Sequence, residues 1–152
     1  MKKLLFLVFL LAAGVGAAVL AQRGLLPGVA TQKVQIKKKT WRFLECLKFK
    51  EFQEAAAFHT AEDLKANPNI PKQLESFFKI PHENLDIQDI EIDFIECDST
   101  GMRCKVKTTT TVHVLNRTET KRIESMLYWK KVDGQWYLDL RTTLERGATG
   151  PF

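Results

Sequence analysis

The sequence is poor in the residues that catalytic and metal sites usually require. Its three histidines, His59, His82 and His113, are scattered along the 152 residues without the paired spacing typical of metal ligands. It also contains no glycine-rich phosphate loop, no nucleophile motif, no internal repeat and no low-complexity tract. These absences favour a protein that performs no catalysis and needs no metal and no cofactor.

An excess of charge of one sign is also largely missing. The formal net charge is +5, but Lys2 and Lys3 lie in residues 1–21, which contain no acid, so the rest of the chain carries 5 − 2 = +3. That excess is too small to imply a nucleic-acid partner, and no nucleic-acid-binding motif is present. With 45% hydrophobic residues, the composition is that of one ordinary globular domain.

The first 21 residues are the strongest signal for location. Lys2 and Lys3 precede an apolar run that ends in small residues, with Val19 and Ala21 at the −3 and −1 positions for cleavage before Gln22. As a helix, residues 4–21 would be about 27 Å long, enough to cross a bilayer. Two alternatives therefore stay open for residues 1–21, a signal peptide or a single membrane anchor helix. Both predict an exported protein, either periplasmic or inner-membrane-anchored and facing the periplasm.

Residues 22–39 are expected to form a basic linker. The segment contains Pro27-Gly28 and a cluster of three lysines, and it shows no clear periodicity. It is interpreted either as a solvated tether or as a segment weakly attracted to anionic lipid head groups, through which the chain would contact the membrane.

Residues 40–146 have the pattern of an α+β domain. A helical period covers 40–59, and its apolar face comprises Trp41, Leu44, Leu47, Phe52, Ala55 and Phe58. Short helices are expected at 60–65 and 71–78. From residue 85 the period changes to two, which predicts strands at 85–97, 102–115, 121–131 and 135–142. Helices that precede an antiparallel meander indicate N-terminal helices packed on a sheet of about four long strands. Residues 147–152 are expected to be a tail.

The turn Asp133-Gly134 is the clearest hairpin signal in the chain. A two-residue turn there would pair Val132 with Gln135 and Trp129 with Leu138. Trp136 would then lie on the same strand face as Leu138, and we expect it to pack between the sheet and the first helix.

Two motifs in this domain resemble those of the nuclear transport factor 2-like superfamily. They are Phe-x-x-Ala-Ala at 52–56 and Trp-x-Lys-x-Asp-Gly-x-Trp at 129–136, and the resemblance covers roughly residues 40–141. It implies a cone in which a bent sheet wraps a long helix and leaves a cavity. The superfamily includes ketosteroid isomerases, polyketide cyclases, scytalone dehydratase, small-molecule carriers and many exported protein-binding domains, so the resemblance implies a fold more than a function.

Five residues are candidates for a ligand pocket inside such a cone: Trp41, Phe52, Glu51, Tyr128 and Trp136. An enzyme of this shape needs a buried acid or a His-Asp pair together with a tyrosine donor, and Glu51 with Tyr128 is the pair we would test first. His113 is expected to face solvent by strand parity. Glu51 and His59 would lie about 12 Å apart on one helix, too far to act together.

The cysteines allow two arrangements around the turn at 98–101. If Thr100-Gly101 form a two-residue loop, Cys97 lies opposite Cys104 and a disulfide can form, as an oxidising compartment would favour. A three-residue loop would pair Cys97 with Arg103 and turn the thiols apart. Cys46 is expected to be a buried free thiol.

The leading functional expectation is a non-catalytic protein-binding domain, for example a subunit of a cell-envelope complex. Self-association would use the sheet face that carries Lys105, Lys107, Thr109 and Thr111. One alternative is a carrier of a hydrophobic small molecule, which predicts a cavity of a few hundred Å³. The other is an isomerase- or dehydratase-like enzyme, which predicts a buried Glu51 near the hydroxyl of Tyr128.

Overall fold

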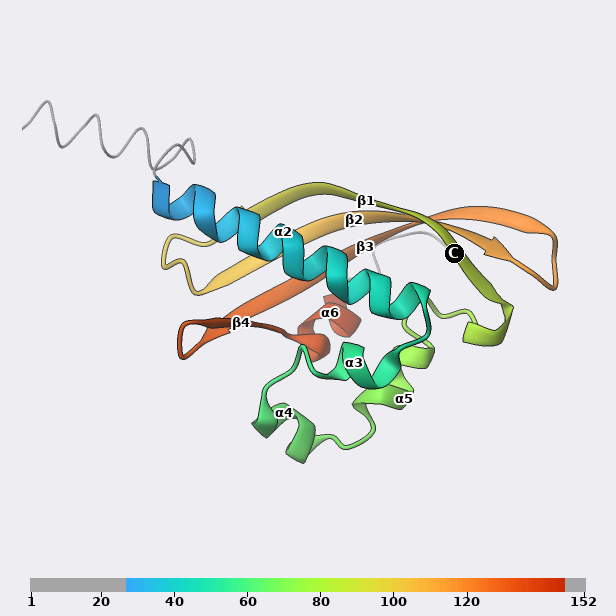
Figure 1. Cartoon of the computed structure of the whole chain (residues 1–152), viewed down its shortest axis with the longest axis horizontal. Coiled ribbons are helices and arrows are strands. Elements are labelled where there is room, and N and C mark those ends of the chain that lie inside the picture. Colours follow the sequence, from blue (N-terminus) through green and yellow to red (C-terminus); the bar gives the residue numbers. More distant parts are fainter. Residues whose placement is uncertain (1–26, 147–152) are drawn as a thin grey trace, which may run out of the picture. The chain divides into compact units, whose positions relative to one another are not determined.

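The computed structural model describes residues 27–146, beginning with helix α2 (Pro27–Lys48). The chain divides after Gln35, and the unit that starts at Ile36 contains every later element (Figure 1). These elements are α3 (Phe52–Ala56), α4 (Ala61–Ala66), α5 (Ile70–Glu75), the 3-10 turn η1 (His82–Asn84), β1 (Leu85–Cys97), β2 (Arg103–Val114), β3 (Glu119–Val132), β4 (Gln135–Leu138) and α6 (Leu140–Arg146).

The four strands form one antiparallel sheet in the order β1-β2-β3-β4, so the predicted α+β class is confirmed. The last hairpin has the predicted register, with Val132 opposite Gln135 and Trp129 opposite Leu138. Asp133 and Gly134 both adopt positive φ, at 48° and 77°, as a two-residue hairpin turn requires.

Helices cover one face of this sheet (Figure 1). Alternate β2 residues on this helix face are buried, namely Cys104, Val106, Thr108, Thr110, Val112 and Val114. Trp129 on β3 packs edge-to-face against Phe43 of α2 and Phe58, which follows α3, with ring centroids 6.5 and 6.2 Å apart. Lys105, Lys107, Thr109 and Thr111 lie on the opposite face, here called the open face, as strand parity predicted.

Helix α2 begins at Pro27, so residues 27–39 of the predicted basic linker are helical, although their sequence shows no clear periodicity. Proline is favoured in the first turn of a helix, and lysines are good helix formers, so the basic cluster continues the helix. Within the second unit, Ile36 of this segment is fully buried, and burial of apolar side chains stabilises a helix more than propensity does.

The predicted helix at 40–59 is two helices. Helix α2 ends at Lys48, and Lys50 takes a left-handed φ of 62° before α3 starts. The amide of Glu51 donates to the carbonyl of Cys46 at 2.8 Å, which closes the end of α2. Neither Gly nor Asn stands at this break, so no local signal announces it. Helix α4 lies within the predicted short helix at 60–65 except at its last residue, and it begins with a reciprocal capping box between Thr60 and Asp63.

The predicted fourth strand at 135–142 is wrong in its second half, which forms α6. Asp139 starts this helix: its Oδ1 accepts from the amide of Thr142 at 3.1 Å, and its Oδ2 accepts from the Thr142 hydroxyl at 2.8 Å. As a result β4 pairs only with residues 129–132 of β3. The first part of β3 therefore has β2 as a neighbour on one side and no described strand on the other.

The predicted leader at 1–21, the first part of the predicted linker and the predicted tail at 147–152 lie outside the described residues. Within 27–146, none of the helices combines the length and the apolar character that crossing a bilayer requires.

Candidate functional site

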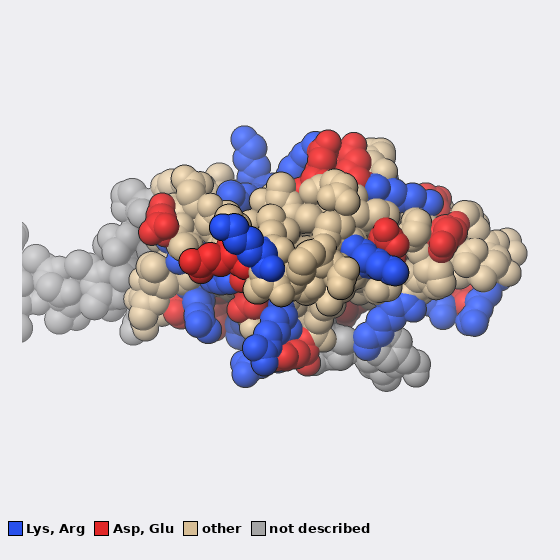
Figure 2. Space-filling model, turned by 90° about the horizontal axis from the view of Figure 1, so that it is seen from below, with Lys and Arg blue, Asp and Glu red and all other residues tan. Residues whose placement is uncertain are grey.

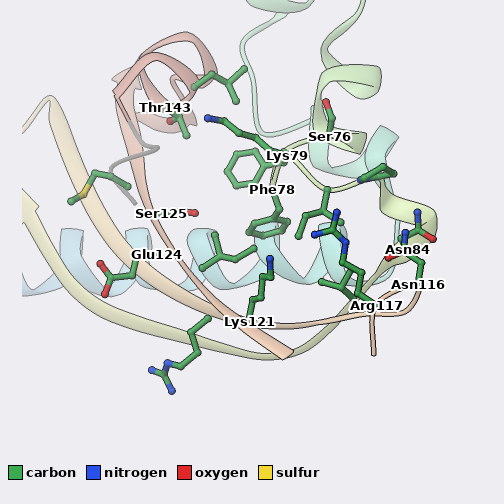
Figure 3. Close-up of a pocket in the computed structure, with 18 residues that line it drawn as sticks. Ser76, Phe78, Lys79, Asn84, Asn116, Arg117, Lys121, Glu124, Ser125 and Thr143 are labelled. Atoms are coloured by element: carbon green, nitrogen blue, oxygen red, sulfur yellow. The ribbon is translucent and has the colours of Figure 1, made fainter. Parts of the chain in front are cut away.

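A cavity of about 620 Å³ lies between the first part of β3, the segment 76–81 that follows α5, and α6 (Figure 3). Much of its wall is apolar. The apolar lining residues are Phe77, Phe78, Ile80, Pro81, Val114, Ile123, Met126 and Leu144. Phe77 and Phe78 stand edge-to-face with ring centroids 5.1 Å apart, and Phe77 also packs against Phe43 in the core, which anchors this wall.

The cavity exists because β4 is short. Leu140 and Thr143 of α6 are buried where a longer β4 would have continued, and the Thr143 hydroxyl accepts from the amide of Tyr128 at 3.0 Å. The amide of Asp139 donates to the carbonyl of Tyr128 at 2.8 Å. Both backbone groups of Tyr128, its amide and its carbonyl, therefore point away from β2. Because backbone groups alternate along an antiparallel ladder, the amides and carbonyls of Arg122, Glu124 and Met126 also point away from β2, toward the side of β3 where the cavity lies.

Basic side chains lie around this cavity. Lys121 of β3 and Arg117 of the β2–β3 turn point into it, and Lys79 extends along it toward Thr143 (Figure 3). The two other ionisable lining residues, Arg122 and Glu124, are paired on the open face: Arg122 lies 3.2 Å from Glu91, and Glu124 lies 2.9 Å from Lys107. Glu124 also points away from the cavity in Figure 3. The interior is therefore apolar with a positive rim.

Elsewhere on the surface, charges of opposite sign stand side by side, as Figure 2 shows for one face. Ion pairs join Lys105 to Glu96 at 3.0 Å and Lys130 to Asp63 at 2.9 Å. The two opposite charges of such an ion pair largely neutralise each other, so these pairs attract a charged partner only weakly.

The structure separates the five predicted pocket residues from this cavity, because none of them lines it. Trp136 is buried in the core as predicted, at 1% exposure, whereas Trp41 is 44% exposed. Phe52 and Tyr128 are half-buried, and Phe52 lines a second, much smaller cavity, where its ring centroid lies 5.2 Å from that of His82. Glu51, the fifth residue, follows α2 and has a side chain that is 40% exposed.

Sequence reasoning did not anticipate this cavity, in part because it extended the fourth strand to residue 142 and assigned no helix at 140–146. The aspartate that caps α6, three residues before Thr142, was the local signal that could have revealed the helix.

A cluster of Cys46, Glu51 and Glu54 has ligand-type atoms within 4.8 Å of one another. Arg42 already neutralises the carboxylates, with Nη2 3.3 Å from Glu54 and 4.0 Å from Glu51. Burial raises the pKa of the Cys46 thiol, so the thiolate that a metal would bind is disfavoured. We interpret the cluster as a surface ion-pair group.

His59 is the one buried histidine among the described residues, at 3% exposure. Its Nδ1 lies 2.9 Å from the carbonyl of Ala56, and its Nε2 has no hydrogen-bond partner among residues 27–146. Burial lowers the pKa of His59 below its ordinary value of 6.5, although the contact with Ala56 and the charge of Asp63 oppose that shift. The fold therefore holds this imidazole neutral.

This pKa shift predicts a loss of stability in acid. Below pH 6.5 the unfolded chain binds a proton at His59 before the folded chain does, so the free energy of unfolding falls as the pH falls. Urea unfolding at about pH 8 and about pH 5 should show a smaller decrease for His59→Gln than for the wild type. Equal decreases in the two proteins would contradict a neutral His59 in the fold.

Cys97 and Cys104 form a disulfide, as the alternative that places them opposite each other predicted. The loop is longer than the two residues expected: the amide of Asp98 donates to the carbonyl of Arg103 at 2.9 Å, which leaves residues 99–102 in the turn. They are directly paired in the β1–β2 ladder, with Cα atoms 4.0 Å apart. Asp98 supports the turn, because its Oδ1 accepts from the amides of Met102 and Arg103 at 3.1 and 3.2 Å. Cys46 is free and buried, as predicted.

Comparison with known proteins identifies no family. No protein-family model matches the chain, and no curated protein matches it. Among solved structures, the chain is similar to the solution structure of a SEC-C motif containing protein from Rhodopseudomonas palustris, with a TM-score of 0.47 and 12% identity over 62% of this chain and 67% of that one. A likeness at this level supports no argument about function.

Proposed function

We propose that this chain is a non-catalytic domain that binds a hydrophobic small molecule. The observation that carries the proposal is the cavity of about 620 Å³ with apolar walls between β3, the segment 76–81 and α6. Ligand pockets typically have volumes of roughly 300–1,000 Å³ and mainly apolar linings with a few polar groups. This cavity supports the small-molecule carrier that the sequence analysis gave as an alternative. Its lining residues differ from the five predicted there.

An enzymatic role has less support from the geometry. A general acid or base must reach the reacting atoms, usually from a site where burial shifts its pKa. Glu51 is half-exposed beside Arg42, and neither Glu51 nor Tyr128 lines the cavity. Glu124 is the acidic residue of the lining, and it is paired with Lys107 on the open face.

Two further parts of the proposal rest on sequence. Export to the periplasm, with or without a retained anchor, is supported by the apolar run at 4–21 and is consistent with the Cys97–Cys104 disulfide, because disulfides persist in oxidising compartments. Membership of the nuclear transport factor 2-like superfamily, with its cone, is supported by the motifs at 52–56 and 129–136 and by helices on one face of an antiparallel sheet.

Filling the cavity should abolish binding. Ser125 lines the cavity from the helix face of β3, so Ser125→Phe is expected to lower the affinity for a hydrophobic fluorescent probe at least about tenfold. Thr111→Phe, on the open face of β2, adds the same side chain elsewhere and should leave the affinity unchanged. Equal binding by the wild type and Ser125→Phe would contradict the proposal.

Protein binding remains a second candidate, and the exposed edge of β3 favours it. Apart from their ladder to β2, the backbone groups of residues 120–126 make no backbone hydrogen bond to another described residue. An unpaired edge can accept an extended segment as an additional strand. Native mass spectrometry of the protein from its host separates the candidates, because a bound small molecule and a bound polypeptide differ in mass.

A further inference from the structure

We propose that the ligand of this cavity is an anionic amphiphile, whose carboxylate or phosphate head is held by Arg117 and Lys121 while its apolar body lies against Phe77, Phe78 and Leu144. This inference rests on the proposed function and adds the chemical class of the ligand. It follows from the charges around the cavity, the position of the two cations and the composition of the opposite wall.

The charges that face the cavity are positive. Five ionisable residues line it, four basic and one acidic. The acidic one, Glu124, is 2.9 Å from Lys107, and the basic Arg122 is 3.2 Å from Glu91, both on the open face. Arg117 and Lys121 remain on the cavity side, so an anion is favoured there and a cation is repelled.

Arg117 and Lys121 are placed together by the β2–β3 hairpin. The amide of Arg117 donates to the carbonyl of Val114 at 3.1 Å, and Thr118 takes a positive φ of 52°, which closes the turn. Lys121 lies opposite Val112 in the ladder, on the helix face. Both side chains point into the cavity in Figure 3. Because the hairpin holds both backbones, little ordering is needed to bring two cations to one head group.

Neither cation is strongly engaged by protein. Arg117 has no ion pair within residues 27–146, and Lys121 meets Glu119 at 3.5 Å, with both side chains more than 40% exposed. An exposed pair of this kind stabilises by about 1 kcal/mol or less, so a ligand head group can compete for Lys121. Asn84 and Asn116 line the same region and offer further amide donors.

The opposite wall is apolar and extends the cavity away from these cations. Phe78 is buried, whereas Leu144 of α6 is 43% exposed, so its side chain offers apolar surface to a ligand at the cavity. Thr143 lies beside Leu144, but its hydroxyl is already occupied by the amide of Tyr128. A ligand that combines one anionic head with an apolar chain satisfies both ends at once.

The test compares ligands that differ only in the head group. Decanoate, decyl phosphate and decanol are titrated below their aggregation limits, with isothermal calorimetry on the full chain. We expect either anion to bind at least about tenfold more tightly than decanol, since each tenfold corresponds to about 1.4 kcal/mol. The tighter of the two anions identifies the head group as carboxylate or phosphate.

Charge variants localise the effect. Arg117→Gln combined with Lys121→Gln should remove most of the preference for the anions and leave the affinity for decanol within about twofold of wild type. Arg103→Gln together with Lys72→Gln removes the same charge away from the cavity and should keep the preference. The affinity of the anions should also fall as salt is added.

The outcomes separate the inference from the proposed function. If decanol binds the wild type as tightly as both anions, or if the double variant keeps the preference, the anionic head is refuted while the hydrophobic site stands. If none of the three ligands binds, both proposals fail. Circular dichroism and the retained disulfide show that each variant is folded, and the substituted side chains are at least partly exposed.

Discussion

Replacing Trp129 with alanine is expected to lower the free energy of unfolding by about 4 kcal/mol, within the range measured for large aromatic residues in protein cores. Trp129 is 1% exposed, and it makes edge-to-face contacts with both Phe43 and Phe58. The substitution removes the buried surface and leaves a cavity where β3, α2 and the segment after α3 meet. Urea unfolding monitored by far-UV circular dichroism measures the loss.

The matched control is Trp41→Ala. Trp41 lies on α2 and is 44% exposed, so it buries much less surface on folding than Trp129 does. Its replacement should lower the free energy of unfolding by about 1 kcal/mol or less. The same chemical change at two sites thus tests burial alone. Losses of similar size at Trp129 and Trp41 would mean that Trp129 is not a core residue and that the packing of α2 on the sheet differs from that described.

Reduction of the Cys97–Cys104 disulfide is expected to lower the free energy of unfolding by about 2.5 kcal/mol, from the entropy that the bond removes from the unfolded chain. The two residues are separated by seven positions, which makes a short loop and a moderate effect. The hairpin should persist after reduction, because Asp98 still accepts from the amides of Met102 and Arg103. Guanidinium unfolding with and without a reducing agent measures the change.

The double variant Cys97→Ser, Cys104→Ser provides the control for reduction. Its stability should match that of the reduced wild type, and the reducing agent should not change it further, since Cys46 forms no disulfide. A wild-type protein whose stability does not respond to reduction would contradict a bridge between β1 and β2 in solution.

Much of the sheet could be predicted because its signals are local. The alternation at 85–97 places a strand whose observed bounds are the same, Leu85–Cys97. Asp133-Gly134 defines a hairpin register that β3 and β4 follow. Cys97 and Cys104 lie opposite each other across a loop of even length, and parity is what their pairing requires. Each of these inferences depends on residues close together in the chain.

The breaks between helices could not be predicted in the same way. Lys50 takes a left-handed φ that lysine adopts rarely, at a position where nothing in the local sequence interrupts the period. A continuous helix over residues 40–59 would satisfy the same local hydrogen bonds. The break brings Ala55 and Ala56 into the core, and that gain depends on contacts with distant residues.

Local signals in the sequence were enough to predict the α+β class and the four strands in meander order, because period-two alternation and turn chemistry act between near neighbours. They left two arrangements open for Cys97 and Cys104, which differ in the length of one turn. The end of β4, and with it the cavity, depended on tertiary packing as well as on the cap at Asp139. Trp136, Leu138 and Leu140 alternate as a strand would, yet Leu140 is buried as the first residue of α6. A buried side chain at that position is compatible with either element, so the Asp139 cap and the contact of Thr143 with Tyr128 of β3 together determined which one formed.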